Sequence, residues 1–191
     1  MTGCLGTVLW RDEAAQLTEY CAFRQAEEGL HLEGVVLAAV NETPLRITYR
    51  VACDREGLTR SAVVEVTGGP DARHIELAAD AARVWRLDGR ELPDCCGLAD
   101  VDLGFSPSTN SLAIRRLRLA VGESRALAAT WVRFPEFDVV VFPQRYTRLA
   151  LDRYRFESGL DEFQAELIVD EQGIVRQYGG LWQAAAAGRD C

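Results

Sequence analysis

The sequence predicts a mainly β fold, and three observations support this. Alternating apolar and polar residues recur along the chain, most clearly at 45–54, where Ile47, Tyr49 and Val51 share one face. Turn signals separate such segments about every eight to twelve residues. One segment alone has a strong helical pattern. We therefore expect a single domain over residues 1–191, with one long, mainly antiparallel sheet that buries a face against one α-helix.

The first half of the chain reads as a succession of strands. The predicted strands are 6–11, 18–25, 30–40, 45–54 and 59–67, followed by short strands at 74–77, 83–87 and 90–92. The last two are joined by the hairpin signal Asp88-Gly89. The break at 68–71 is interpreted as a long hairpin loop and not as a domain boundary. The run 78–82 could be helical, but it is short and uncapped.

The stretch 100–119 combines a strand, a break and a helix. Asp100 and Asp102 alternate with apolar residues, so an extended segment here has one acidic face and one apolar face. Gly104 and Pro107 end that segment. Four helix-capping candidates surround the break: Ser106, Ser108, Thr109 and Asn110. The helix is predicted over 112–117.

Strands are predicted again in the remainder of the chain, at 125–134, 137–142, 146–157, 163–170 and 174–178. Pro143 is expected to end the second of these strands. The alanine run 184–187 and the residues after it are expected to form a frayed tail.

Composition narrows the classes of function. The net charge of −8 and the pI of about 4.9 argue against binding to nucleic acid or to an anionic membrane surface. All 21 basic residues are arginine, so neither a Schiff-base lysine nor a P-loop lysine is present. The start of the chain does not have the pattern of a signal peptide, and no apolar run has the length of a transmembrane segment. We therefore expect a cytoplasmic protein.

The six cysteines have no zinc-binding spacing. In a reducing compartment they would be buried thiols that act as small apolar side chains.

Asp100 and Asp102 are the leading candidates for chemistry. On one strand face their side chains would lie roughly 7 Å apart, which suits two carboxylates that share a water, a cation or the hydroxyls of a sugar. A solvated strand face would have the same pattern. Arg115 and Arg116 follow in the predicted helix, where they need partners if a sheet surrounds them. The sequence thus leaves open an interior ion-pair network and a polar ligand pocket.

Asp54 and Glu157 each lie at the end of a predicted strand and could join this group. His31 and His74 lie far apart and lack a convincing third ligand, so neither is assigned a zinc or catalytic role. The common motifs of serine hydrolases, nucleotide-binding proteins and zinc proteases are absent. We assign no catalytic residue and expect no metal and no cofactor.

Five motifs occur in order along the second half of the chain: D-V-D-L-G-F-S-P-S-T-N-S-L-A-I-R-R-L at 100–117, W-V-R-F-P at 131–135, Q-R-Y-T at 144–147, Y-R-F-E-S at 154–158 and A-E-L-I-V-D-E-Q-G-I-V at 165–175. This order resembles the bacterial putative glycolipid-binding family, formerly a domain of unknown function. The resemblance covers most of the chain, and Y-R-V-A-C-D at 49–54 is also similar.

The resemblance implies a spiral β-roll, in which a long antiparallel sheet curls around one helix, and a tight homodimer. It also implies an acidic pocket and a part in glycolipid metabolism. By motif match, it implies a ligand-binding role for six residues: Asp100, Asp102, Arg115, Arg116 and, more weakly, Asp54 and Glu157. The chain departs from the family pattern at Leu58, where an aromatic residue is expected, and at Ala113, where proline is expected.

Three hypotheses about function follow. In the first, the protein binds an amphiphile such as a glycolipid without catalysis, and Asp100 and Asp102 accept hydrogen bonds from sugar hydroxyls. In the second, it is a hydrolase that acts on a glycoside or an ester through paired carboxylates, one of them protonated. In the third, it is a structural homodimer without a ligand, and the acidic cluster is an ion-pair network.

Overall fold

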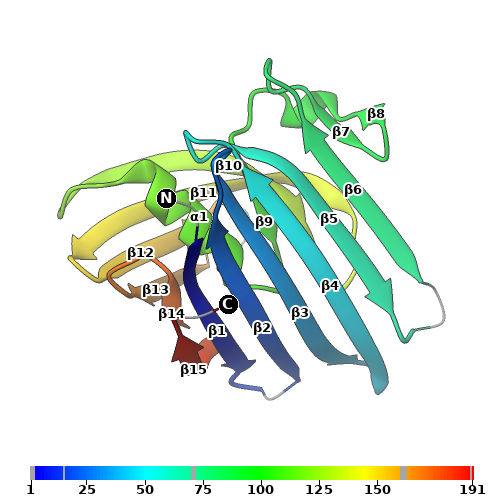
Figure 1. Cartoon of the computed structure of the whole chain (residues 1–191), viewed down its shortest axis with the longest axis horizontal. Coiled ribbons are helices and arrows are strands. Elements are labelled where there is room, and N and C mark those ends of the chain that lie inside the picture. The colour runs from blue at the N-terminus through cyan, green and yellow to red at the C-terminus, as the bar shows by residue number, and fades with distance from the viewer. Residues whose placement is uncertain (1–2, 15, 70–71, 160–162, 190) are drawn as a thin grey trace.

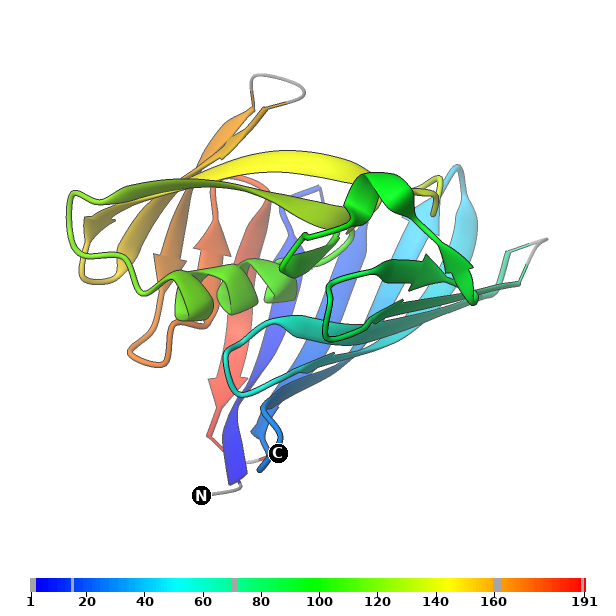
Figure 2. The same ribbon diagram turned by 90° about the horizontal axis from the view of Figure 1, so that it is seen from above.

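The computed structural model describes residues 3–14, 16–69, 72–159, 163–189 and 191. Within these residues one fifteen-stranded sheet curls around one α-helix (Figures 1 and 2). The predicted mainly β fold, with a curled antiparallel sheet around a helix, is therefore confirmed.

The first eight strands pair antiparallel in chain order, because short turns join them. They are β1 (Gly3–Asp12), β2 (Leu17–Gln25), β3 (Leu30–Val40), β4 (Thr43–Cys53), β5 (Thr59–Thr67), β6 (Arg73–Ala79), β7 (Trp85–Leu87) and β8 (Arg90–Glu91). Their apolar residues alternate inward and form the larger core. A 3₁₀ turn, Pro93–Cys95, follows β8.

The other seven strands form the second half of the sheet. They are β9 (Asp100–Leu103), β10 (Ser124–Val132), β11 (Val139–Ala150), β12 (Arg153–Ser158), β13 (Gln164–Val169), β14 (Val175–Tyr178) and β15 (Trp182–Gly188). The antiparallel pair of β1 and β15 joins the two halves. β9 and β10 are parallel, and the crossover between them contains the helix α1 (Ser108–Leu117).

Helix α1 packs between the two halves of the curled sheet. Leu112 contributes to the larger core, whereas Ala113 and Ile114 contribute to a second core on the inner face of the later strands. The helix ends at Leu117, and the next residue, Arg118, adopts a left-handed conformation (φ 47°) and donates its backbone N–H to the carbonyl of Ile114. The predicted helix was thus correct in place, although it begins four residues earlier, at Ser108.

Two predictions about the second half were wrong. Pro143 does not end a strand, because β11 continues through it to Ala150. The carbonyl of Pro143 accepts the N–H of Gly159, which lies just beyond the end of β12. Proline has no N–H to donate, but the neighbouring strand has already ended at this position, so the sheet tolerates it. The segment 146–157 is two strands, β11 and β12, with a turn at Leu151 and Asp152.

The predicted frayed tail was also wrong. Residues 182–188 form β15, which pairs with β1 on one side and with β14 on the other. The prediction failed because an alanine run has no strand periodicity, and its pairing partners lie far away in the sequence. The tentative helix at 78–82 does not form either, since Ala78 and Ala79 belong to β6.

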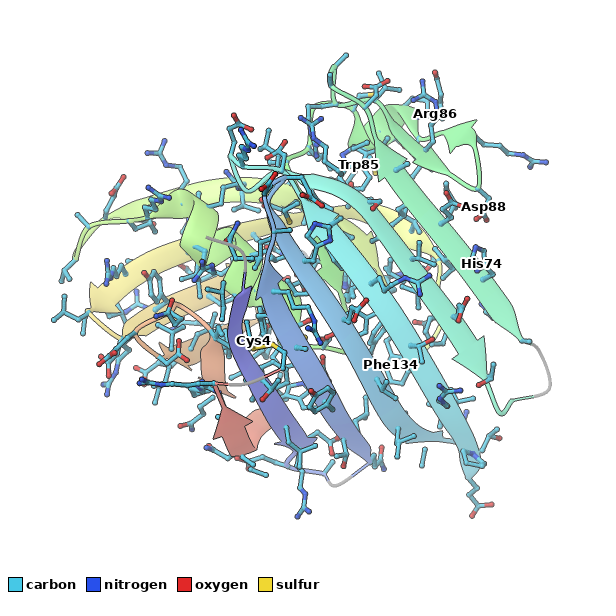
Figure 3. The ribbon with its side chains drawn as sticks, in the orientation of Figure 1. Cys4, His74, Trp85, Arg86, Asp88 and Phe134 are labelled. Atoms are coloured by element: carbon cyan, nitrogen blue, oxygen red, sulfur yellow. A yellow bond between two sulfur atoms is a disulfide. The ribbon has the colours of Figure 1, made fainter. Side chains whose placement is uncertain are left out.

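The cysteines are of two kinds. Cys21, Cys53 and Cys95 are buried thiols, as expected, and Cys96 is an exposed thiol. In contrast, Cys4 and Cys191 form a disulfide, with Cys4 in the first strand (Figure 3). No helix in the described part of the chain is long and apolar enough to cross a membrane.

Candidate functional site

Residues of β9–β12, β14 and β15 and of the first turn of α1 line a cavity of about 230 Å³, here called the aromatic cavity. Six aromatic side chains line it: Trp131, Phe142, Phe156, Phe163, Tyr178 and Trp182. Four polar side chains also line it: Asp102, Ser106, Asn110 and Ser158. The cavity therefore combines apolar faces with a small set of hydrogen-bonding groups, as ligand sites commonly do.

The aromatic side chains hold one another in place. Trp131 stacks on Phe142 with their ring centroids 4.2 Å apart, and Phe156 meets the ring of Tyr178 edge-on at 5.7 Å. Gly104 leaves the space for the indole, since a Cβ at this position would lie 2.8 Å from Nε1 of Trp131. Contacts of this kind connect five of the six rings, all but Trp182, into one continuous wall.

Asp102 is the charged group of the aromatic cavity, and only 8% of its surface is exposed. Gln144 donates to its Oδ2 at 2.6 Å. Burial raises the pKa of Asp102 to about 6, and the charge of Asp100 raises it as well, whereas the Gln144 hydrogen bond opposes the shift. Tyr146 connects this pair to the helix, because its hydroxyl donates to Gln144 and accepts from Asn110 at 2.8 Å.

Asp100 lies on the same face of β9 but has a different environment. It is 2% exposed and forms a two-pronged ion pair with Arg116, with Nε of Arg116 2.8 Å from Oδ1. The alternative of a solvated strand face is therefore wrong, because both carboxylates are buried. The structure separates the two residues: Asp102 faces the aromatic cavity, whereas Asp100 belongs to an interior ion pair.

A second polar group lies beside the cavity, around Glu19 of β2. Its Oε1 accepts the Ser106 hydroxyl at 2.6 Å and is hydrogen-bonded to the hydroxyl of Tyr49, which also reaches Ser108 at 2.8 Å. Ser106 also lines the aromatic cavity, so it connects Glu19 to that space.

Gly34 makes this arrangement possible. It lies on β3 between Cys21 of β2 and Tyr49 of β4. A Cβ at Gly34 would lie 2.2 Å from the Tyr49 ring, so only glycine lets the ring cross β3 and place its hydroxyl at Glu19.

Glu19 is fully buried, and its Oε2 has no hydrogen-bond partner in the described part of the chain. Burial raises the pKa of Glu19 to about 8, although the hydrogen bonds from Ser106 and Tyr49 oppose the shift. Near neutral pH this carboxyl is therefore mainly protonated.

The other four predicted site residues do not line the aromatic cavity. Asp54, Arg115 and Arg116 line a separate cleft between the β4–β5 turn and the last turn of α1. Glu157 alternates with the buried Phe156 and Ser158, so it lies on the opposite face of β12 from the cavity.

The sequence analysis missed Glu19 and the aromatic wall. Glu19 shares a strand face with Cys21 and Phe23, and a charge on the apolar face of a strand is a signal that could have identified it. The wall could not be identified in this way, because its rings come from five strands and a loop that only the fold brings together. The described residues contain no group of three or more His, Cys, Asp or Glu side chains able to hold a metal ion.

The fold and the cavity define a class of protein in which a long β-sheet curls around one helix and encloses an aromatic cavity with a buried acid. The chain belongs to the family described as putative glycolipid-binding, whose model matches residues 7–184. No curated protein matches the sequence.

The structure is similar to the crystal structure of a DUF1089 family protein from Pseudomonas aeruginosa. The two chains share 34% sequence identity, and the TM-score is 0.78. The match covers 86% of this chain and 91% of the other.

Proposed function

We propose that the protein binds an amphiphile with a carbohydrate head group, and that the head group enters the aromatic cavity. One observation carries this proposal: six aromatic side chains line the same cavity as Asp102 and Asn110. The description of the family as glycolipid-binding supports the same ligand class.

The chemistry of a sugar suits this arrangement. The C–H groups on one face of a sugar ring pack on aromatic faces such as that of Trp131. Its hydroxyl groups donate to the Asp102 carboxylate and accept from the side-chain amide of Asn110. The hydrogen bond from Gln144 holds Asp102 in place, so the carboxylate is preorganised for the ligand.

The first experiment is native mass spectrometry of protein purified from its own host, followed by organic extraction. We expect a stoichiometric glycolipid.

Titration with octyl β-D-glucoside then tests the site: Asp102→Asn should weaken binding about tenfold, the value of one charged hydrogen bond. Asp94→Asn, an exposed residue outside the cavity, is the matched control. Unliganded protein from the host together with no binding of octyl glucoside to the wild type would contradict the proposal.

A hydrolase is the second candidate, and a specific observation favours it. Of two neighbouring carboxyl groups, Asp100 is paired with the Arg116 guanidinium, whereas Asp102 has a raised pKa and lines the cavity. This is the pattern of a general acid beside a charged partner. Turnover of nitrophenyl glycosides or esters that is lost in Asp102→Asn would favour it over simple binding.

The homodimer and the cytoplasmic location are proposals as well. Tyr20 and Leu37 are exposed apolar residues on the neighbouring strands β2 and β3, which supports a contact between copies. Light scattering tests the dimer, with Leu37→Glu expected to weaken it.

The Cys4–Cys191 disulfide weighs against a reducing compartment, and fractionation of host cells tests the location.

A further inference from the structure

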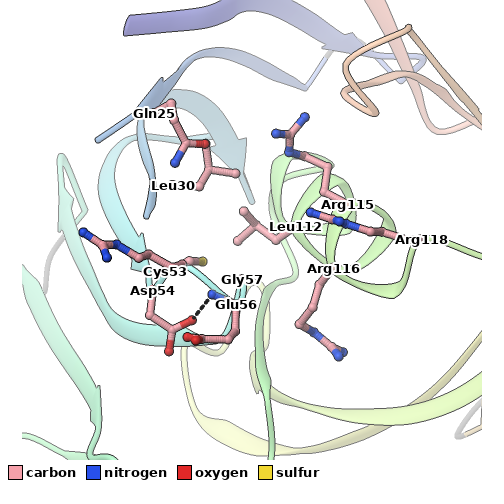
Figure 4. A pocket seen from close by; sticks show the side chains of 11 residues that line it. Gln25, Leu30, Cys53, Asp54, Glu56, Gly57, Leu112, Arg115, Arg116 and Arg118 are labelled. Carbon is pink, nitrogen blue, oxygen red and sulfur yellow. Dashed lines mark hydrogen bonds between the residues drawn. The ribbon is translucent and has the colours of Figure 1, made fainter. Parts of the chain in front are cut away.

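A second cleft, of about 450 Å³, lies between the β4–β5 turn and the last turn of α1 (Figure 4). Four arginines line it: Arg55, Arg115, Arg116 and Arg118. We call it the arginine cleft. It shares no lining residue with the aromatic cavity, so an inference about it does not rest on the proposed function.

Some charges of the arginine cleft are neutralised within the protein. Arg116 is paired with Asp100. Asp54 lies 2.7 Å from Arg60 and accepts the backbone N–H groups of Glu56 and Leu58, so it stabilises the β4–β5 turn. These groups therefore have structural partners and need no ligand.

Arg115 and Arg118 have no such compensation. Arg115 is half-buried and donates a hydrogen bond to the carbonyl oxygen of Gln172, which carries no charge. The exposed guanidinium of Arg118 makes no hydrogen bond or ion pair with any described residue. Burial lowers the pKa of the Arg115 guanidinium, and the nearby charge of Arg118 lowers it further, whereas the charge of Asp170 opposes the shift.

The position of Arg115 is built into the fold. Gly173 lies against it, and a Cβ at Gly173 would approach Cγ of Arg115 to 3.1 Å. A neighbouring cleft of about 540 Å³ is also lined by Arg115 and Arg118, so both guanidiniums border open space. Arg115 is a half-buried cation beside a second cation and without a charged hydrogen-bond partner, so an anion bound between the two would be stabilising.

We propose that Arg115 and Arg118 form a binding site for an oxyanion of the phosphate or sulfate class. Guanidinium groups suit such an anion, because their planar N–H groups bind two oxygens at once. The anion is either free or the head group of a lipid whose chain lies along Ile114, Leu151 and Tyr154 in the neighbouring cleft.

The test is a titration of the ¹⁵N-labelled protein with inorganic phosphate at constant ionic strength, with chloride as the reference anion. We expect saturable shifts of the amides of Gly57, Arg118 and Gly173. Arg118→Gln should weaken phosphate binding about tenfold, and Arg115→Lys should weaken it less than Arg115→Gln does. Arg125→Gln is the control, because Arg125 is exposed, pairs with Glu123 and lines neither cleft.

Equal affinity of the wild type and Arg118→Gln for phosphate would overturn the proposal, and so would equal, unsaturable shifts with phosphate and chloride.

Dioctanoyl phosphatidic acid distinguishes the two sources of the anion. Binding at least tenfold tighter than that of phosphate, with added shifts at Ile114 and Leu151, indicates a lipid, whereas equal affinity indicates a free anion. Arg118→Gln should leave the affinity for octyl glucoside unchanged, so failure here is distinct from failure of the proposed function.

Discussion

The environment of Glu19 is set by residues far along the chain. Its hydrogen-bond partners Tyr49 and Ser106 lie 30 and 87 residues away in the sequence. A carboxyl group that is fully buried resists ionisation, because the charged form loses its hydration. Glu19 is therefore a hydrogen-bonding acid next to the cavity and not a surface charge.

A pH dependence of stability follows from Glu19. Its pKa rises from 4.5 to about 8 on folding, so the folded state binds a proton more tightly than the unfolded state does. The contribution of Glu19 to the free energy of unfolding should therefore be largest below about pH 4.5. It should fall by about 3–5 kcal/mol as the pH rises from there through 8. Glu19→Gln should remove most of this fall in urea unfolding curves.

Glu33→Gln is the control, since Glu33 is exposed on the adjacent strand. It should keep the pH dependence of the wild type. If the free energy of unfolding of Glu19→Gln changes with pH as steeply as that of the wild type between about pH 5 and pH 9, then Glu19 is not the buried acid described above.

At the level of one element, the first turn of α1 is both polar and buried. Each side chain has a partner on a different part of the sheet. Ser108 bonds to Tyr49, Thr109 accepts the N–H of Leu103, Asn110 donates to Tyr146, and Ser111 accepts the N–H of Val175. The helix is short and has no side-chain cap, so these bonds, together with its packing, hold it in place.

The Asp100–Arg116 pair fixes the other end of this helix to β9. Arg116→Gln should lower the free energy of unfolding by about 3 kcal/mol, because it leaves the buried carboxylate of Asp100 unpaired. The double variant Asp100→Asn/Arg116→Gln should cost less than the sum of the two single variants. Chemical denaturation of the four proteins measures this coupling.

The exposed pair Arg133–Asp138 is the control cycle. Its coupling should be much smaller, because water screens both groups. A coupling of Asp100 to Arg116 no larger than that of the exposed pair would contradict the assignment of an interior ion pair.

On the scale of the whole molecule, the two halves of the sheet meet where the ends of the chain pair. β1 and β15 are neighbours, and the Cys4–Cys191 disulfide links residues 187 positions apart beside this pair. Both halves contribute to the larger core around the helix, since Trp182 of β15 packs there with Val8 and Trp10 of β1. The disulfide therefore restrains the last strand, which holds the roll together.

Removal of the disulfide should destabilise the fold. Cys191→Ser should lower the free energy of unfolding by about 2–4 kcal/mol, because a cross-link between distant residues restricts the unfolded chain. A reducing agent should lower the melting temperature of the wild type to that of Cys191→Ser. Cys96→Ser, which removes an exposed free thiol, should match the wild type with and without the reducing agent. An oxidised wild type that melts with Cys191→Ser would contradict this prediction.

The sequence by itself determined the strand-rich, mainly antiparallel fold and the place of the helix, because side-chain periodicity and turn residues act locally. It also singled out Asp102 as a candidate site residue, which stays a prediction. Tertiary structure alone decided that Asp100 is an ion-pair partner, that Glu19 is buried, that 182–188 is a strand and that six rings form one cavity. These features depend on contacts between residues that are distant in the chain, and no local pattern specifies which distant residues meet.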